Sequence, residues 1–321
     1  MGFWINVLMV ISGSILLYFI KQYFNGGVCT IRKEISNKVV IITGASSGIG
    51  LETARYLAAM GATIIFACRN RDKTLYLIDE IKKETNNEKL EYIPLDLTSI
   101  EQINYFCLLF KKRFNQLDIL INNAGIMCSK YMQSQDGLEL TYSVNFLGHF
   151  TLTYQLLDLI RKNSRCRIIN VSSVAHSKCD ELDISRINDI DYFDSFQAYW
   201  RSKLAIILFT KELQRKLEGL GPKCVCVHPG LSRTDLVDEL LSEKLWLKIV
   251  MYLLYPLYWL VTKDSWQGAQ TAIYCALEKH DKLMSGGYYV DCELSKSSQL
   301  SENKLLAQEL WDDSAVVLGY I

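Results

Sequence analysis

The stretch TGASSGIG at residues 43–50 decides the fold; it reads Thr43-Gly44-Ala45-Ser46-Ser47-Gly48-Ile49-Gly50. It follows the apolar run 39–43, which is typical of a buried strand, and leads into an amphipathic stretch of helical length at 49–60. Strand, glycine-rich turn and helix in this order form the fingerprint of a dinucleotide-binding unit. A plain glycine and serine loop is the weaker alternative, because it explains neither the strand nor the helix.

The three glycines have separate tasks in such a turn. Gly44 permits the tight bend, while Gly48 and Gly50 let the backbone approach a pyrophosphate and let the helix pack on the sheet. The helix N-terminus offers free N–H groups and a partial positive charge to the phosphates. The loop therefore predicts a phosphate site directly after the first strand.

The alternation of strand and helix continues outward from this unit. Apolar runs typical of buried strands lie at 63–67, 90–95, 119–122, 167–171 and 224–227, and amphipathic helical stretches lie at 73–84, 100–114, 137–160 and 196–217. This order predicts an α/β fold with a doubly wound parallel sheet of the Rossmann type, covered by helices on both faces. With only four prolines and no repeat, residues 38–295 are expected to form a single domain, followed by a C-terminal tail at 296–321.

Residues 1–20 differ in kind from the rest of the chain. They contain no charged side chain and are long enough to cross a hydrocarbon core of ~30 Å as a helix. A cleaved signal peptide is the alternative, but no basic segment precedes the apolar run and no small-residue cleavage site follows it. We expect an uncleaved membrane anchor at 1–20 and a connector at 21–37. Because Lys21, Arg32 and Lys33 follow the anchor, the domain should face the cytosol, with the endoplasmic reticulum as the favoured membrane.

Composition excludes several partners. The chain has 35 basic and 35 acidic residues, so its formal net charge is zero, which argues against a role on nucleic acid. Its ten cysteines are scattered without a CxxC pair, and Cys224 and Cys226 alternate as strand residues do. We expect buried free thiols in a reducing compartment and no metal site. Whether the protein forms a homo-oligomer is not readable from the sequence.

The end of the second strand bears on the choice of cofactor. An acidic residue at this position binds the ribose 2′-hydroxyl of NAD, whereas an arginine accommodates the 2′-phosphate of NADP. Here the strand ends in Arg69-Asn70, and the first acidic residue is Asp72. NADP(H) is the expected cofactor; the alternative is that Arg69 only begins the next helix.

Tyr199 and Lys203 open the last predicted helix with i, i+4 spacing, so the phenol and the ammonium share one helix face. A nearby cation favours the phenolate and lowers a phenol pKa toward the neutral range, which suits a general acid–base. A Tyr-x-x-x-Lys pair alone is a weak signal. Here it follows the strand that ends in Val171-Ser172-Ser173, at the edge of the sheet where such folds place their ligands.

These motifs together resemble the short-chain dehydrogenase/reductase family over about residues 38–290. The eight-residue glycine loop, Asn122-Asn123-Ala124-Gly125 after the fourth strand, and Tyr199 with Lys203 carry the resemblance. AYWRSKLAIILFTKELQRKL and VNFLGHFTLT place the chain near the retinol dehydrogenase-like branch and its X-linked dehydrogenase/reductase relatives.

The resemblance implies a catalytic set of Asn145, Ser173, Tyr199 and Lys203. In carbonyl reduction Tyr199 would donate a proton, Ser173 would polarise the carbonyl, and Asn145 would support the proton relay. Lys203 would lower the tyrosine pKa and hold the nicotinamide ribose. Ser173 matches the family serine better than Ser172.

The resemblance also implies the cofactor contacts. Asp96 and Leu97 would lie along the adenine, the turn 123–125 would close the cleft, and Pro229, Gly230 and Thr234 would hold the nicotinamide carboxamide. The whole expected set is Gly44, Ser46, Ser47, Gly48, Ile49, Gly50, Arg69, Asn70, Asp96, Leu97, Asn123, Ala124, Gly125, Tyr199, Lys203, Pro229, Gly230 and Thr234.

The apolar stretch 245–261 is the expected substrate cover, within a lid at about 235–262. Lys248 and Pro256 speak against a membrane-spanning helix there; a helix pair packed on the core is the alternative. We predict an NADP(H)-dependent oxidoreductase that interconverts a lipophilic alcohol and its aldehyde or ketone. A retinoid or polyprenoid is favoured over a steroid or fatty aldehyde, and a non-catalytic NADPH-binding membrane scaffold or sensor is the alternative function.

Overall fold

The computed structural model describes residues 2–232 and 255–320. One eight-stranded sheet organises it, with the order β3-β2-β1-β4-β5-β6-β7-β8. Every neighbouring pair is parallel except β7 and β8. The predicted doubly wound Rossmann sheet is confirmed. The strands are β1 Val39–Thr43, β2 Thr63–Cys68, β3 Leu90–Pro94, β4 Ile119–Asn122, β5 Arg167–Val171, β6 Lys223–His228, β7 Tyr288–Val290 and β8 Glu293–Ser295.

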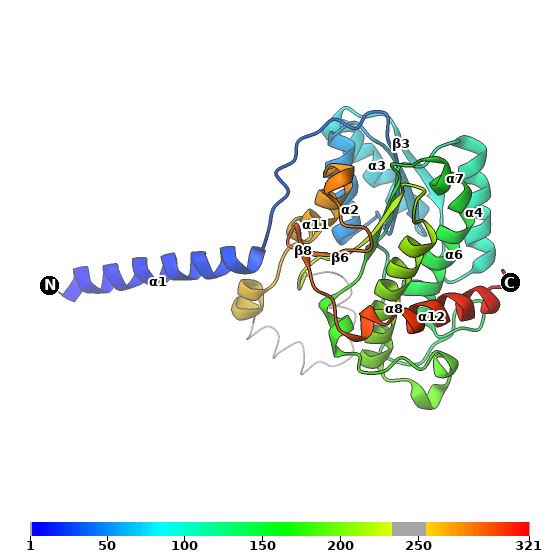
Figure 1. The fold of residues 1–321 in the computed structure, drawn as a ribbon. Helices are drawn as coiled ribbons and strands as arrows, with labels where there is room; N and C mark the ends of the chain where they lie inside the picture. The colour runs from blue at the N-terminus through cyan, green and yellow to red at the C-terminus, as the bar shows by residue number, and fades with distance from the viewer. Residues whose placement is uncertain (1, 233–254, 321) are drawn as a thin grey trace.

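Helices cover both faces of the sheet (Figure 1). On one face, α2 (Gly48–Ala59), α3 (Arg71–Thr85) and α11 (Ser265–Leu277) bury one apolar cluster. On the other face, α4 (Ile100–Arg113), α6 (Gly148–Gln155), α7 (Leu157–Lys162), α8 (Ser195–Lys216) and α12 (Lys304–Val317) bury the second cluster. The strands between the two layers are almost continuously apolar, as expected for a sheet buried on both sides.

The predicted helix 137–160 is broken in the structure. Gly137 has φ +77° and lies in a turn, so the helical segment begins only at α5 (Leu140–Tyr142). A π-helical turn, η1 (Ser143–Leu147), follows, and α6 and α7 are separated at Leu156. Residues 141–153 are buried throughout, so the segment has no single apolar stripe from which a change of helical period could be read.

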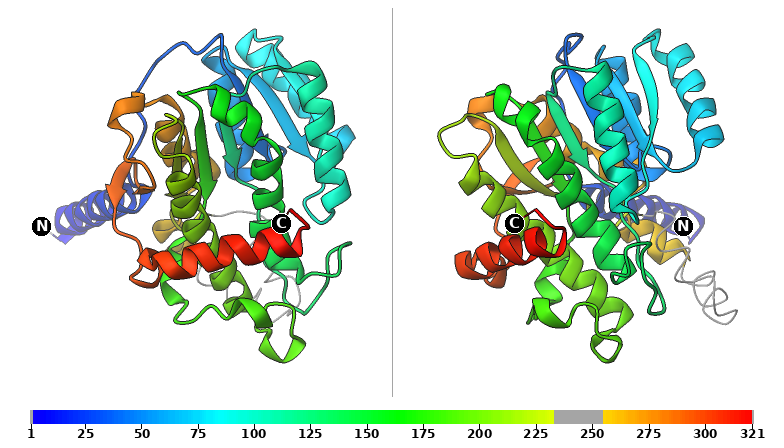
Figure 2. Two further views of the ribbon diagram at one scale, coloured as in Figure 1. Left: turned by 45° about the vertical axis from the view of Figure 1, so that its right-hand side comes forward. Right: turned by 90° about the vertical axis from the view of Figure 1, so that its right-hand side faces the viewer.

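Short 3₁₀ turns lie between β5 and α8, between α11 and β7, and between β8 and α12. They are η2 (Val174–Lys178), η3 (Ile184–Arg186), η4 (Ile190–Tyr192), η5 (His280–Lys282) and η6 (Leu300–Glu302). The segment predicted as a C-terminal tail contains α12, which packs against α8 (Figure 2). Leu310 and Trp311 on α12 are buried, so this helix is part of the domain's packing.

The N-terminal residues form the helix α1 (Gly2–Asn25), which projects from the domain in Figures 1 and 2. Within the described residues, no helix is both long and apolar enough to cross a membrane. The connector is tied to the domain, because the Cys29 N–H donates to Gln270 Oε1 (3.1 Å) and the Ile35 N–H donates to the Met60 carbonyl (2.8 Å).

Candidate active site

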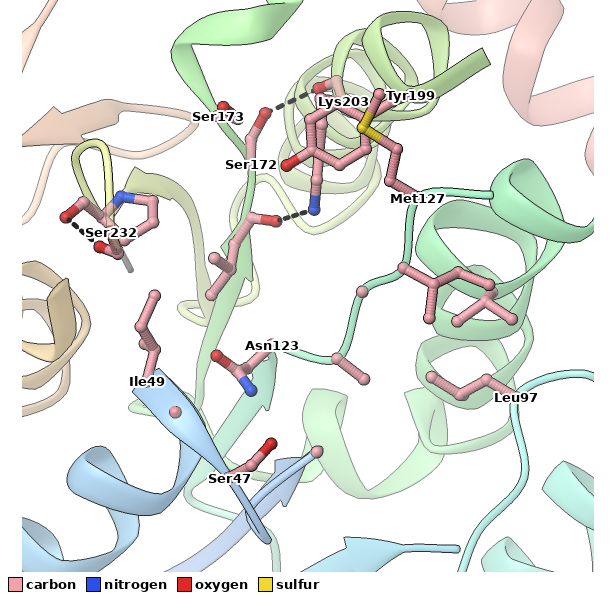
Figure 3. A pocket seen from close by; sticks show the side chains of 18 of the residues that line it. Ser47, Ile49, Leu97, Asn123, Met127, Ser172, Ser173, Tyr199, Lys203 and Ser232 are labelled. Carbon is pink, nitrogen blue, oxygen red and sulfur yellow. Dashed lines mark hydrogen bonds between the residues drawn. The ribbon is translucent and has the colours of Figure 1, made fainter. Parts of the chain in front are cut away.

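A cavity of about 710 Å³ opens at the carboxyl ends of the parallel strands. Loops after six strands and the first turns of α8 line it, as expected for ligand sites of open α/β sheets. Ser47 and Ile49 lie at one end of it, and Ser173, Tyr199 and Lys203 gather at the other (Figure 3). The predicted site residues that line it are Gly44, Ser46, Ser47, Gly48, Ile49, Arg69, Asn70, Asp96, Leu97, Asn123, Ala124, Gly125, Ser173, Tyr199, Lys203, Pro229 and Gly230.

Two predicted residues do not line the cavity. Gly50 and Asn145 lie behind its wall and support it. Thr234, like most of the predicted lid at 235–262, falls outside the described residues, of which only 255–262 belong to that segment.

The glycine loop fits a dinucleotide phosphate group. Gly44 and Gly48 have φ +66° and +54°, a region that favours glycine. A Cβ on Gly50 would lie 2.4 Å from the Gly44 carbonyl oxygen, so this residue is needed for packing α2 onto the loop. Ser47 is the N-cap residue of α2, but its side chain makes no capping hydrogen bond. The Ser47 side chain therefore leaves the first N–H groups of α2 to an anion at the cavity.

The adenosine end of the cavity is basic. Arg69, Asn70 and Lys73 line it at the end of β2, and Asn70 Oδ1 caps α3 by accepting from the Lys73 N–H (3.0 Å). Asp72 does not line the cavity. This side-chain set suits an extra phosphate on the ribose better than a free 2′-hydroxyl.

Thr43 fixes the turn that forms the cavity floor. Its Oγ1 accepts from the N–H groups of Asn123 (2.9 Å) and Ala124 (3.0 Å). The Asn123 Nδ2 donates in return to the Thr43 carbonyl oxygen (2.9 Å). Strands β1 and β4 are therefore joined at the point where the strand order reverses.

Helix α8 carries the pair Tyr199 and Lys203 and is capped by Asp194, whose Oδ1 accepts from the Gln197 N–H (2.9 Å). The Lys203 Nζ lies 5.5 Å from the centre of the Tyr199 ring and donates to the Val171 carbonyl oxygen (3.1 Å). The end of β5 and the start of α8 thus meet at one point, as the spacing predicts.

Burial dominates the acid–base properties of this pair. It raises the pKa of the Tyr199 phenol to about 12, while a hydrogen bond with Ser173 lowers the pKa. Burial also lowers the pKa of the Lys203 ammonium to about 8. The expected lowering of the tyrosine pKa by Lys203 is not found: burial raises the pKa, and the opposing effect comes from Ser173. At neutral pH Tyr199 is therefore an intact proton donor beside a cationic Lys203.

Asn145 lies in the π-helical turn η1 and is fully buried. Its Oδ1 accepts from the Ile126 N–H (2.8 Å), and its Nδ2 donates to the Ile126 carbonyl (3.0 Å) and to Ser202 Oγ (2.9 Å). A Cβ on Gly125 would lie 3.4 Å from both Asn145 Oδ1 and Lys203 Nζ. Asn145, Gly125 and Lys203 thus form one contiguous group.

The sequence did not reveal the apolar part of the cavity. Phe196 and Trp200 lie one turn apart on α8 with ring centres 6.2 Å apart, and both line the cavity beside Tyr199. Met127 and Leu231 add further apolar surface from loops after β4 and β6. The i, i+4 spacing of Phe196 and Trp200 could have predicted an apolar face beside Tyr199. Nothing in the sequence around Met127 and Leu231 indicates that they line the cavity. Among the described residues no group of three potential ligands forms a metal site.

Comparison with known proteins agrees with this geometry. The family model of short chain dehydrogenases matches residues 38–245. The chain is 39% identical to retinol dehydrogenase 12 of Bos taurus, over 98% of this chain and 95% of that protein. It is 37% identical to retinol dehydrogenase 13 of Mus musculus, over 97% of this chain and 91% of that protein.

Solved structures share the fold. An uncharacterized protein from Mycobacterium paratuberculosis superposes with a TM-score of 0.73 at 29% identity, covering 92% of this chain and 98% of that one. The complex of RhlG with NADP from Pseudomonas aeruginosa superposes with a TM-score of 0.62 at 20% identity, covering 80% and 95% of the two chains.

Proposed function

This chain belongs to the short-chain dehydrogenase/reductase family, in its retinol dehydrogenase-like branch, and from that premise we propose that it interconverts a lipophilic alcohol and its carbonyl form with NADP(H). Membership makes it an NAD(P)(H)-dependent oxidoreductase that acts on alcohols. The observation that carries the finer proposal is the shape of one cavity. A phosphate-binding helix end and Arg69 lie at one end of it, and a protonated phenol beside a cation and an apolar wall lies at the other.

The side chains suggest how the carbonyl is handled. The Ser173 and Tyr199 hydroxyls are positioned to hold the substrate oxygen, and Tyr199 donates its proton there. The cationic Lys203 stabilises the phenolate left behind, and Asn145 holds the loop and helix that carry this pair. The bound cofactor supplies the hydride, or accepts it in the reverse direction. Trp200 and Phe196 give the reacting end an apolar wall.

The preference for NADP(H) rests on Arg69 and Lys73. Both line the cavity where a ribose 2′-phosphate would lie, and a permanently charged guanidinium suits bidentate phosphate binding. Replacing Arg69 by Asp should weaken NADPH binding and relatively favour NADH. An unchanged cofactor preference would defeat this assignment.

The proposed substrate is a retinoid or a polyprenoid at a membrane surface. The apolar wall of the cavity supports it, as do the names of the relatives. Exposed apolar side chains continue outside, on α1 (Leu16, Phe19) and on the helix at 255–261 (Leu257, Trp259). We propose that residues 1–20 anchor the protein, with the domain on the cytosolic side of the endoplasmic reticulum.

A panel assay tests the proposed function. The full-length protein in lipid vesicles is given all-trans-retinal, a polyprenal, a steroid ketone and a fatty aldehyde, each with NADPH and with NADH. We expect turnover of the retinoid or the polyprenoid with NADPH. Preferred turnover of the steroid or fatty aldehyde would overturn the substrate class. Tight NADPH binding without any turnover would instead favour the scaffold or sensor.

A further inference from the structure

His149 connects two parts of the site that the proposed catalytic side chains leave separate. It is buried on α6, one helical turn after Asn145. Its Nδ1 lies 2.9 Å from the Asn145 carbonyl oxygen, and its Nε2 lies 2.9 Å from the Thr43 Oγ1. The imidazole therefore joins the π-helical turn of the catalytic asparagine to the end of β1, where the glycine loop begins.

The partners determine which ring nitrogen carries the proton. A carbonyl oxygen only accepts, so the hydrogen on the Asn145 side must belong to Nδ1. The Thr43 Oγ1 already accepts from the N–H groups of Asn123 and Ala124, which occupy both of its lone pairs. Its own hydrogen is then donated to Nε2, since the other acceptor in reach, the Ile121 carbonyl, is farther away at 3.5 Å. His149 is thus neutral, with Nδ1 protonated.

The surroundings agree with this protonation state. The pKa of His149 is lowered to about 4; burial is the main cause, the hydrogen bond to the Asn145 carbonyl opposes it, and the nearby Lys203 cation adds to the lowering. A second proton on Nε2 would face a hydroxyl with no lone pair left to accept it. The ring therefore remains a neutral link throughout the working pH range.

We infer that His149 is a positioning residue that keeps the Asn145 carbonyl and the Thr43 hydroxyl at a fixed separation. It thereby sets the position of the proton-transfer site relative to the cofactor-binding turn. This inference rests on the proposed function. Asn145 and Lys203 flank Gly125, and Gly125 directly follows the two residues that Thr43 holds. Loss of the bond at Nδ1 would move Asn145 relative to Lys203, whereas loss of the bond at Nε2 would leave Asn145 in place and free only the Thr43 hydroxyl.

Two conservative variants separate the two halves of the link. The amide nitrogen of His149→Asn replaces Nδ1 and keeps the bond to the Asn145 carbonyl, whereas the amide of His149→Gln reaches the position of Nε2 and keeps the bond to Thr43. We expect His149→Asn to retain most of kcat. His149→Gln should lose kcat about tenfold, the effect of one hydrogen bond, with unchanged NADPH affinity. His280→Gln, at a half-buried histidine remote from the cavity, is the control. If both His149 variants lose kcat equally, and the losses follow a fall in thermal stability, His149 has only a structural role.

The protonation state can be read without any turnover. With only four histidines in the chain, ¹⁵N-histidine NMR of the cofactor-free full-length protein in detergent, with each signal assigned by substitution, reports each ring separately. We expect Nδ1 protonated and Nε2 unprotonated for His149 from pH 5 to 9. Thr43→Val should keep this form, because the Asn145 carbonyl still requires the proton on Nδ1, but its Nε2 signal should shift because the hydrogen bond from the Thr43 hydroxyl is lost. A protonated Nε2 in the wild type would overturn the inference. If the substrate panel fails while this pattern is found, the proposed function fails and the link stands.

Discussion

At the scale of single residues, burial is the main cause of the pKa shifts of both Tyr199 and Lys203. Removal of water raises the pKa of Tyr199 to about 12 and lowers that of Lys203 to about 8, because burial penalises the charged form of each. Near neutral pH this leaves a protonated phenol and a cationic amine. That combination suits proton donation to a carbonyl; the reverse reaction would need the phenolate, which we propose Lys203 stabilises.

Replacing Tyr199 by Phe removes the proton donor and keeps the ring. We expect kcat for carbonyl reduction to fall by about 10²–10⁴, the usual contribution of a general acid. NADPH affinity, measured by fluorescence titration, should be nearly unchanged, because the phosphate loop and Arg69 are untouched. Retained turnover would refute the role assigned to Tyr199.

Lys203 should limit activity on the alkaline side. Its pKa in the folded protein is lowered to about 8, so the ammonium is complete below that pH and is lost as the pH rises through it. The phenolate formed at Tyr199 then loses its stabilising cation, and kcat/KM should fall above about pH 8. Lys203→Arg keeps its charge over the whole range, so its profile should lack this alkaline limb. If kcat/KM falls at the same alkaline pH in the wild type and in Lys203→Arg, a group other than Lys203 causes the fall.

At the scale of elements, the sequence predicted the structure best for the central strands, whose apolar runs have burial as their one physical cause. The limits of β1, β4 and β5 match the predicted strands, because buried apolar runs end at polar turn residues. The π-helical turn at Asn145 was missed because residues 141–153 are buried on every side, so no apolar stripe marks a change of helical period. The hairpin of β7 and β8 was also missed, since each strand has three residues and the turn uses Asp291 and Cys292 at positive φ, without the glycine that usually marks such a turn.

Helix α12 stabilises the layer that holds the catalytic helix. Trp311 is buried against Phe150 and Phe209, with ring centres at 4.9 Å and 5.9 Å. Trp311→Ala should therefore lower the free energy of unfolding by about 3–5 kcal/mol, as is usual for a buried aromatic residue. Leu305→Ala on the same helix is the control, because Leu305 is 80% exposed and its loss should change stability by about 0.5 kcal/mol or less. Chemical denaturation of both variants checks this, and equal effects would show that α12 is not part of the core.

At the scale of the whole molecule, the parallel sheet explains how much of the site could be predicted. Because parallel strands end at one edge, the glycine loop, Arg69, the turn 123–125 and Ser173 had to meet there once the strands were known. The apolar wall could not be placed in the same way, since Met127 and Leu231 come from loops whose paths depend on packing.

The contact between α1 and the predicted lid could not be predicted from the sequence either. Lys21 joins them, because its Nζ donates to the carbonyl oxygens of Trp259 (2.8 Å) and Thr262 (2.6 Å) and lies 4.8 Å from the centre of the Trp259 ring. These carbonyls end the helix at 255–261, so Lys21 caps that helix across more than two hundred residues of chain.

Replacing Lys21 by Met should loosen the helix at 255–261 from the base of α1. Hydrogen bonds from a charged group are each worth about 1.5–3 kcal/mol, so amide exchange in this helix should be at least about tenfold faster. Hydrogen-exchange mass spectrometry of the full-length protein in vesicles measures this, with Lys33→Met, at an exposed lysine of the connector, as the control.

If the helix guides a lipid-dissolved substrate to the cavity, KM for that substrate should rise in Lys21→Met, while KM for a short water-soluble aldehyde stays constant. Equal changes in both KM values would mean that the link acts on the cavity itself and not on entry from the membrane.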